Sequence, residues 1–213
     1  MDKKLLERIK SDTTFPVQSE TWVRSVKPRM ICLHHTASAP GTAGDITWWK
    51  NDKAPVSTPV LIERDGTIVQ IYSSDRWAFA LGLNTPNYRQ IEELTVQVEI
   101  DTWGFLTQKN GKFYSYTGAE VPASEVCTLD IPFKGMRFFH RYTPEQIEST
   151  RLLCIHWGQK FGIPLKYVGD ADFFSLSQKA RNGVPGLYSH NSFRADKTDL
   201  HPQKDMIEML KTL

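Results

Sequence analysis

The sequence predicts a single α/β domain, and three local patterns carry that prediction. Two β-rich runs, 60–63 and 67–71, flank Asp65-Gly66, which is the strongest short-range signal for a β-hairpin. Residues 94–100 alternate apolar and polar side chains, as a strand with one buried face and one polar face does. The segment 143–146 (TPEQ) has the cap residue, proline and glutamine that begin a helix.

Composition and charge exclude several classes of protein. Apolar residues make up 40 % of the 213 residues, which is ordinary for a globular protein and excludes a disordered or collagenous chain. Lys plus Arg number 26 and Asp plus Glu number 24, so charge favours neither nucleic acid nor an anionic membrane as partner. The sequence has no apolar run of transmembrane length, and its first residues lack the apolar core of a secretory signal. We therefore expect no membrane insertion, and synthesis in the cytoplasm without a signal peptide.

The N-terminal third predicts a helix, a strand and a second helix. We expect residues 1–27 to form a short amphipathic helix over 2–10 and an extended entry segment packed on the domain. The apolar run 29–33 predicts a buried strand that ends at His34-His35. After a loop, Asp45 is placed to cap a helix that contains two tryptophans.

The C-terminal half predicts two longer helices and one more strand. Residues 103–135 are rich in turn formers and aromatics, and we expect an insertion of loops with at most one small hairpin. The helix that begins at 143 should run to about Phe161 and stop at the glycine after it. Further along, 175–180 predicts a helical turn, 187–190 a short strand, and the residues after His201 a final amphipathic helix.

The three cysteines predict buried thiols. Cys32, Cys127 and Cys154 are odd in number, lack C-x-x-C spacing and each lie among apolar residues. That pattern does not predict a disulfide framework, and a buried free cysteine behaves as a small apolar side chain.

Histidine is the residue type that points to chemistry, because neutral imidazole is the commonest metal ligand. His34 and His35 end one predicted strand, His190 ends another, and Asp199 follows nine residues later. Two histidines and one carboxylate, with a fourth position left to water, form a catalytic zinc arrangement. The H-E-x-x-H pattern is absent, so residue types alone leave a metal site and ordinary buried histidines both open.

Five segments then occur in the order of one known family. They are 31–37 (ICLHHTA), 56–68 with its serine and Asp-Gly hairpin, 96–100 (VQVEI), 142–146 (YTPEQ), and Ser189-His190 with the later Lys197-Thr198-Asp199. Together they resemble the zinc-dependent N-acetylmuramoyl-L-alanine amidases of type 2, the family that includes peptidoglycan recognition proteins. The resemblance implies a catalytic domain over 28–213. Its fold would be a central mixed β-sheet of five or six strands flanked by helices, with zinc in a groove at one sheet edge.

The resemblance also implies roles for individual residues. His34, His190 and Asp199 would bind one Zn²⁺ ion. Glu99 occupies the place of the glutamate that serves as general base, and Lys197 that of a cation facing the substrate carbonyl. Zinc lowers the pKa of water toward neutrality and polarises a carbonyl, which is the chemistry that cleavage of an amide needs.

Two of these assignments have a neighbouring alternative. Adjacent strand residues point to opposite faces, so His34 and His35 do not both bind one metal, and which of them does depends on the strand register. Asp196 lies three residues before Asp199, and the Lys-x-Asp spacing favours Asp199.

Substrate contacts are less well defined by the sequence. Trp77, Asn84 and Arg194 are candidates for binding the substrate, and 103–135 is a candidate wall of the groove. Many relatives carry a histidine in the segment matching 77–80 and another where Pro59 stands, and both are missing here.

The resemblance implies hydrolysis of the amide between N-acetylmuramic acid and L-alanine. The substrate would be peptidoglycan or a soluble muropeptide. We expect a monomer that acts as a phage endolysin after its release from the cytoplasm. Three alternatives stay open: a peptidoglycan-binding module without catalysis, a cytoplasmic amidase that recycles muropeptides, and a structural metal. A metal-dependent nuclease is disfavoured by the near-neutral charge.

Overall fold

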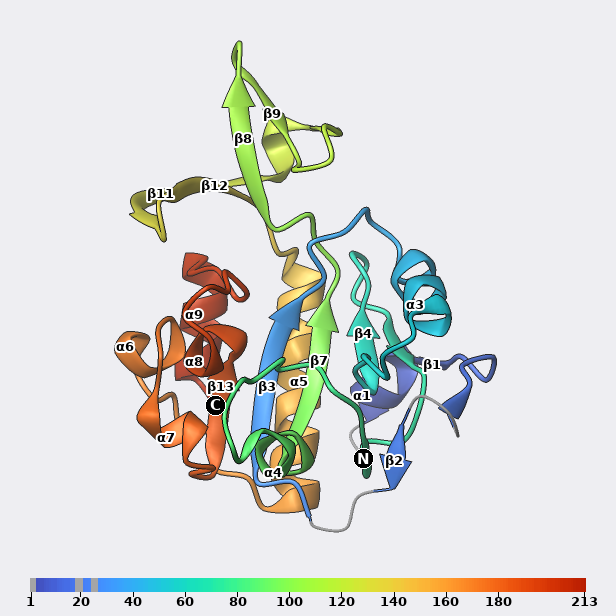
Figure 1. Ribbon diagram of the computed structural model, residues 1–213. Helices are drawn as coiled ribbons and strands as arrows, with labels where there is room; N and C mark the ends of the chain where they lie inside the picture. Colours follow the sequence, from blue (N-terminus) through green and yellow to red (C-terminus); the bar gives the residue numbers. More distant parts are fainter. Residues whose placement is uncertain (1–2, 18–20, 24–26) are drawn as a thin grey trace.

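The structure is a computed structural model that describes residues 3–17, 21–23 and 27–213 (Figure 1). The described residues form three sheets, of six, five and two strands, and a set of mostly short helices; the two-stranded sheet pairs β2 with β6. The strands are β1 (Ile9–Ser11), β2 (Trp22–Val23), β3 (Met30–His35), β4 (Val60–Ile62), β5 (Ile68–Gln70), β6 (Arg76–Trp77), β7 (Thr95–Ile100), β8 (Phe105–Lys109), β9 (Lys112–Tyr114), β10 (Glu120–Val121), β11 (Val126–Phe133), β12 (Met136–His140) and β13 (Gly186–Ser189). The helices are α1 (Lys3–Arg8), α3 (Thr42–Asn51), α4 (Tyr88–Glu93), the 3₁₀ turn η1 (Ala123–Glu125), α5 (Pro144–Phe161), α6 (Asp170–Phe173), α7 (Gln178–Arg181), α8 (His190–Phe193) and α9 (Lys204–Lys211).

The main sheet has six strands in the order β1-β5-β4-β7-β3-β13. Strands β4, β7, β3 and β13 run parallel, β5 runs antiparallel to β4, and β1 pairs with β5 in parallel. Helix α5 crosses behind β3 and β7, and α4 lies on the other side (Figure 1). The predicted α/β fold with a mixed sheet of five or six strands is therefore confirmed.

The hairpin between β4 and β5 forms as its turn residues predict. The backbone N–H of Thr67 donates to the Asp65 carboxylate at 2.8 Å, and Gly66 has a φ of +82°. A Cβ at Gly66 would also lie 2.8 Å from the Glu145 carbonyl oxygen, at the start of α5. Glycine is thus needed both for the turn and for the close approach of the helix.

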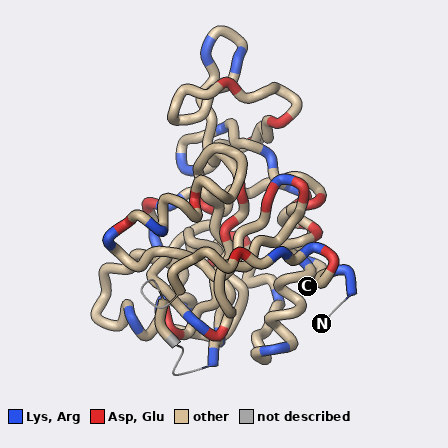
Figure 2. The backbone as a smooth tube through the Cα atoms, turned by 90° about the vertical axis from the view of Figure 1, so that its right-hand side faces the viewer, with Lys and Arg blue, Asp and Glu red and all other residues tan. Residues whose placement is uncertain are grey.

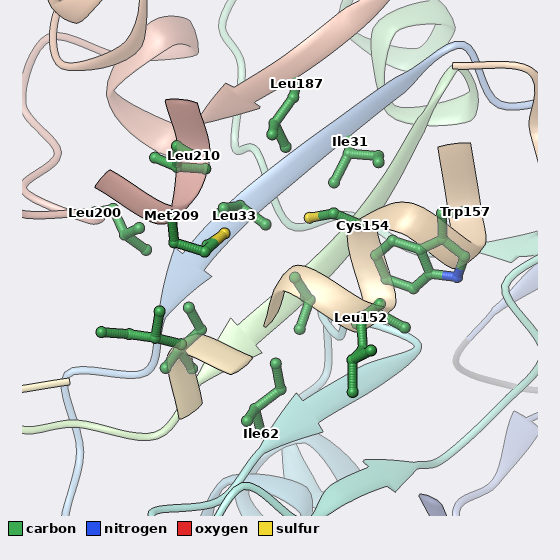
Figure 3. Close-up of a cluster of buried hydrophobic side chains, with 14 of the residues drawn as sticks. Ile31, Leu33, Ile62, Leu152, Cys154, Trp157, Leu187, Leu200, Met209 and Leu210 are labelled. Atoms are coloured by element: carbon green, nitrogen blue, oxygen red, sulfur yellow. The ribbon is translucent and has the colours of Figure 1, made fainter. Parts of the chain in front are cut away.

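Helix α5 begins and ends where the sequence predicts. The Thr143 hydroxyl accepts from the Gln146 N–H at 3.0 Å and the Gln146 side chain accepts from the Thr143 N–H at 3.1 Å, which is a capping box. Gly162 ends the helix in the left-handed conformation, with a φ of 73°. One face of α5, with Cys154 and Trp157, packs on Ile31 and Leu33 of β3 (Figure 3).

Side chains alternate along the central strands between two buried layers. In β3, Ile31 and Leu33 join the core under α5, whereas Met30 and Cys32 join a cluster on the opposite face. In β7 the polar face is buried as well, and Gln97 is almost inaccessible. The predicted alternation of apolar and polar side chains on 94–100 is present, and the polar face is buried because the strand is central, so its polar side chains need partners inside the protein.

The insertion is more regular than predicted. Instead of loops with one small hairpin, it holds a five-stranded antiparallel sheet in the order β10-β9-β8-β12-β11, which extends to His140. This arm projects beyond the carboxyl ends of β3 and β7 (Figure 1). Its own small core contains Leu106, Val121 and Val126. Two of its strands, β9 and β10, have only three and two residues, too few for an alternating pattern to show in the sequence.

Three expected boundaries move. The first helix stops at Arg8, and the next residues form β1 at the edge of the main sheet; residues 1–2, 18–20 and 24–26 of the expected entry segment lie outside the described residues. Helix α3 starts at Thr42 after Gly41, so Asp45 lies in its first turn and does not cap it. The expected strand 187–190 ends at Ser189, and His190 opens α8.

The surface carries both signs of charge along most of the fold (Figure 2). All three cysteines are free and buried. Within the described residues, no helix combines the length and the apolar composition that crossing a membrane requires.

Acid should destabilise the protein partly through His140. This side chain is buried, its Nδ1 accepts from the Trp103 N–H at 3.1 Å, and burial lowers its pKa from 6.5 to about 4. In the unfolded chain His140 takes up a proton near pH 6.5, whereas in the folded chain it stays neutral down to about pH 4. The free energy of unfolding therefore falls as pH decreases from 6.5 toward 4. The loss amounts to about 2 kcal/mol at pH 5.

Urea unfolding of the wild type and His140→Gln at pH 8 and pH 5 measures this effect. Between pH 8 and pH 5, the free energy of unfolding should fall by about 2 kcal/mol more in the wild type than in His140→Gln. His156→Gln, at a half-buried histidine of α5, is the matched control and should change the pH dependence less. Equal pH dependence in the wild type and His140→Gln would contradict the assignment.

Candidate metal centre

Three polar side chains meet at the carboxyl ends of β3 and β13. His34 is the fifth residue of β3, and Ser189 at the end of β13 pairs in parallel register with Leu33. His190, the next residue, therefore stands beside His34. Asp199 comes from the segment between α8 and α9. Parallel sheets commonly build their sites at this edge.

The three side chains direct one atom each at a common point. Nδ1 of His34 and Nδ1 of His190 are 3.0 Å apart, and Oδ2 of Asp199 lies 2.9 Å from the second and 3.3 Å from the first. Ligands placed 2.0–2.1 Å from a tetrahedral zinc ion are about 3.3 Å from each other. Among the described residues this is the one group of three or more histidines, cysteines or acids with such spacing, and all three are buried. The residues present thus fit a zinc ion.

The outer nitrogen of each ring fixes its tautomer. Nε2 of His34 lies 2.8 Å from the amide oxygen of Gln97, and Nε2 of His190 lies 2.9 Å from the carbonyl oxygen of Leu81. Because these oxygens only accept hydrogen bonds, each Nε2 carries the proton. Each Nδ1 is then left with a free lone pair that points to the common point, as metal-binding histidines require.

One buried carboxylate, that of Glu92, holds both of these hydrogen-bond acceptors. It accepts from Nε2 of Gln97 at 2.9 Å and from the N–H of Leu81 at 2.9 Å, with longer contacts to the neighbouring N–H groups of Ala80 and Gly82. Burial raises the pKa of Glu92 to about 6, although these donors oppose the shift. Glu92 therefore orients the partners of the two histidines from a single point.

The segment that carries Asp199 is held from two sides. Asn191, the residue after His190, donates from its side chain to the Leu200 carbonyl at 2.8 Å. Lys134, in the turn between β11 and β12, donates to Oδ1 of Asn191 at 2.8 Å and also to the carbonyl of Lys197. Burial raises the pKa of Asp199, but His190 and hydrogen bonds outweigh burial and bring that pKa well below its usual range.

The neighbouring alternatives point elsewhere. His35 turns to the opposite face of β3, where its Nδ1 lies 2.8 Å from the hydroxyl of Tyr142, and burial lowers its pKa to about 4. Asp196 lies at the surface in an ion pair of 2.6 Å with Arg194. The structure therefore brings together His34, His190 and Asp199, and leaves His35 and Asp196 outside the group.

Glu99 stands beside the group on the same face of the sheet. It pairs in register with His34, and no described residue donates to its buried Oε2. Burial raises the pKa of Glu99 well above its usual value, with Asp199 and Asp45 adding to the effect, while Lys197 opposes it. Glu99 lines a cavity of about 510 Å³, and Lys197 is close enough to act on its charge.

Of the three residues expected to contact the substrate, one is buried and two lie at a surface hollow. Trp77 is 2 % exposed and stacks on Trp22 with ring centres 4.7 Å apart, so it belongs to the core rather than to a groove surface. Asn84 and Arg194 line one hollow of about 300 Å³, together with Arg181. Arg194 also donates to the Gly82 carbonyl, next to the Leu81 carbonyl that holds His190.

The residues that hold the three ligand candidates were not predicted from the sequence. Gln97 had a signal, because alternation along β7 puts it on the same face as Glu99. Lys134 had none, since its contacts join segments about 60 residues apart, and the contacts of Glu92 and Asn191 depend on loop paths that no sequence period marks.

A buried pair of histidines with one carboxylate, at the edge of an α/β sheet and beside a cavity that contains a second carboxylate, is the arrangement of a metal-dependent hydrolase. The family model of N-acetylmuramoyl-L-alanine amidase matches residues 24–202. The chain belongs to this family, and its activity is hydrolysis of the amide that joins N-acetylmuramic acid to L-alanine in peptidoglycan.

Solved structures share the fold at low sequence identity. A mutant of PlyL is 16 % identical, with a TM-score of 0.55 over 96 % of this chain and 99 % of that one. A mutant endolysin from Bacillus subtilis is 14 % identical, with a TM-score of 0.54 over 96 % of both chains. The N-acetylmuramoyl-L-alanine amidase LysC from Clostridium intestinale URNW is 14 % identical, with a TM-score of 0.51 over 94 % of this chain and 93 % of that one. The search of curated protein sequences finds no match.

Removing the amide of Gln97 should weaken metal binding. Gln97→Leu deletes the acceptor that orients His34, and loss of such an outer partner costs about 10- to 100-fold in metal affinity. Competition with a chromophoric chelator measures the affinity for Zn²⁺. Gln146→Leu is the matched control, because Gln146 is equally buried and hydrogen-bonded but contacts none of the three ligands. Equal affinities in the two variants would contradict the role of Gln97.

Proposed function

We propose that this amidase is zinc-dependent and acts on polymeric peptidoglycan as an endolysin, with His34, His190 and Asp199 as ligands of one Zn²⁺ ion. The observation that carries the proposal is the convergence of three buried ligand atoms next to a cavity that contains Glu99. The fit of two imidazole nitrogens and one carboxylate oxygen supports zinc as the metal.

A zinc ion in this place supplies a Lewis acid that polarises the amide carbonyl and lowers the pKa of water. Three protein ligands leave one coordination position for water or substrate, whereas structural zinc sites usually have four protein ligands. The chain therefore has the ligand set of a catalytic rather than a structural site.

Glu99 has the properties of the general base. Its carboxylate lies beside His34 and has no donor among the described residues, so it is free to accept a proton from the attacking water. The new C–O bond then forms at the carbonyl carbon, and Glu99 passes the proton to the nitrogen of L-alanine as the C–N bond breaks. Burial keeps the pKa of Glu99 high, which favours this return of the proton.

Lys197 supplies positive charge on the same side of the site. Its ammonium lowers the pKa of Glu99 electrostatically, which supports a position on the side of the site where the substrate carbonyl would bind. A cation there stabilises the negative charge that develops on the oxygen, an effect worth roughly 2.7–4 kcal/mol per donor. Lys134 fixes the backbone of the same segment through the Lys197 carbonyl.

Three biological roles are compared: a recognition module, a recycling amidase and an endolysin. A recognition module without catalysis would lack a metal ligand or the base, and this chain has candidates for both. A recycling amidase would act on soluble muropeptides. Two solved structures that share the fold are described as endolysins, and the arm beside the site adds surface for a polymer. These points favour degradation of the intact wall.

A digest of purified peptidoglycan tests the activity and its metal. The protein should release intact stem peptides with a free L-alanine N-terminus, seen by mass spectrometry, and should lose this activity after chelation and regain it with Zn²⁺. The rate should be higher on intact wall than on soluble muropeptides. Retention on the wall without any cleavage would instead support a recognition module.

Substitution of Glu99 separates base catalysis from metal binding. Glu99→Gln should lower kcat by about 10²- to 10⁴-fold, because the amide cannot accept the proton. Its zinc content should stay at one ion per chain. Glu208→Gln, at an exposed acid of α9 outside the site, is the matched control and should keep its activity within about twofold, as surface substitutions do. A Glu99→Gln variant with wild-type kcat would rule out the base.

A further inference from the structure

Two exposed aromatic rings face the cavity that contains Glu99. Trp48 on α3 is 60 % exposed, and Tyr116, in the turn between β9 and β10, is 58 % exposed. Both line the same cavity of about 510 Å³. Large apolar rings at the surface are informative when they gather at one hollow, because isolated ones are common. Neither ring has a role in the catalytic steps above.

The cavity has the size of a ligand site and continues along the arm. Its volume lies within the range of about 300–1,000 Å³ that is usual for small-molecule sites. Tyr116 also lines a second hollow of about 470 Å³, together with Tyr114 and Asn110 of the arm. Two hollows that share one aromatic residue suit an elongated ligand with repeated units better than a compact one.

Two carboxylate oxygens at the cavity are buried acceptors without a donor. Oδ2 of Asp45 and Oε2 of Glu99 are shielded from solvent, and neither has a hydrogen-bond donor among the described residues. Burial raises the pKa of Asp45 to about 6, and the nearby Ser38 hydroxyl opposes this only in part. Buried acceptors without partners are costly, so a ligand that brings hydroxyl or amide donors would be favoured.

Apolar rings beside acceptor oxygens match the chemistry of a sugar ring. A pyranose has an apolar C–H face that packs on an aromatic ring, and a rim of hydroxyl and acetamido groups that donate hydrogen bonds. A peptide with several carboxylates fits this cavity poorly, because the carboxylate of Asp45 would repel it.

The hollow lined by Arg194 has the opposite character. It also contains Arg181, Asn84 and Asp196, and its Gly82 follows the Leu81 carbonyl that holds His190. Asp196 is ion-paired with Arg194, so the positive charge that remains is that of Arg181, and it suits a carboxylate of a stem peptide. The two hollows therefore divide the substrate between them by charge, with the neutral glycan next to Glu99.

We propose that Trp48 and Tyr116 bind the N-acetylhexosamine rings of the glycan strand, so that α3 and the arm form a two-sided sugar subsite. The proposal rests on the proposed function for the identity of the polymer. It assigns to the arm a direct role in binding the glycan, through Tyr116.

Binding of a sugar without peptide tests the subsite independently of cleavage. The probe is a hexamer of β-1,4-linked N-acetylglucosamine, titrated calorimetrically into the full-length, zinc-loaded protein. Trp48→Ala and Tyr116→Ala should each weaken binding at least tenfold, and Trp48→Phe and Tyr116→Phe should retain most of it, because they keep an aromatic face. Tyr88→Ala, at an exposed aromatic residue outside the cavity, should bind as the wild type does.

Kinetics on peptidoglycan provide the second measurement. The Trp48→Ala/Tyr116→Ala double variant should raise KM for the polymer at least tenfold with kcat almost unchanged, and thermal melting should show that it folds. The inference is overturned if the wild type does not bind the hexamer, if the alanine variants bind it normally, or if their KM is unchanged. Hexamer binding that depends on both rings, without release of stem peptides, would refute the proposed amidase function and leave the sugar subsite standing.

Discussion

The structure depends on one requirement: two imidazole rings and one carboxylate must turn unprotonated atoms toward the same buried point. Without a cation, three buried acceptors this close together would cost free energy, because none of them can donate a hydrogen bond to the others. The protein meets the requirement from outside the group. Gln97 and the Leu81 carbonyl take the ring protons of His34 and His190, and Glu92 holds both acceptors in place.

The arm connects with this centre at two turns of one small sheet. Lys134, between β11 and β12, fixes the segment that carries Asp199. Tyr116, between β9 and β10, reaches the cavity beside Glu99. The same insertion thus holds the segment of a proposed metal ligand and lines the cavity proposed to bind the glycan. Because the hollow on the Arg194 side is basic and the Glu99 cavity is acidic, the site also has a built-in direction for a substrate with a neutral and a charged part.

Local patterns were enough to predict the elements whose causes are local. The cap at Thr143 and the turn at Asp65-Gly66 lie within a few residues of the structure they determine, and both predictions are confirmed. Helix α3 shows the limit: Asp45 is a good cap residue, but the helix begins three residues earlier at Thr42. The arm was missed because its strands are short and interrupted by turns, so their pairing rather than their pattern defines them.

In the candidate site, too, the residues carried by local motifs could be predicted and those that depend on the fold could not. The ligand positions could be named because motif order carried them, and the alternation of β3 separated His34 from His35. The contacts of Lys134 could not, since they join segments about 60 residues apart, and those of Glu92 could not, since they depend on the path of the loop that precedes α4. Trp77 was expected near the substrate, yet stacking on Trp22 buries it. A tryptophan has no sequence signal that distinguishes a core position from a binding surface.

X-ray absorption at the zinc edge of the metal-loaded protein identifies the atoms that bind the metal. If His34, His190 and Asp199 are the ligands, the spectrum will show two imidazole nitrogens and one carboxylate oxygen, with one further light atom, at about 2.0–2.1 Å. It also predicts that His190→Ala removes one imidazole shell and most of the bound metal. A sulfur ligand at about 2.3 Å, or an unchanged spectrum in His190→Ala, would show that the metal binds elsewhere and would contradict the account.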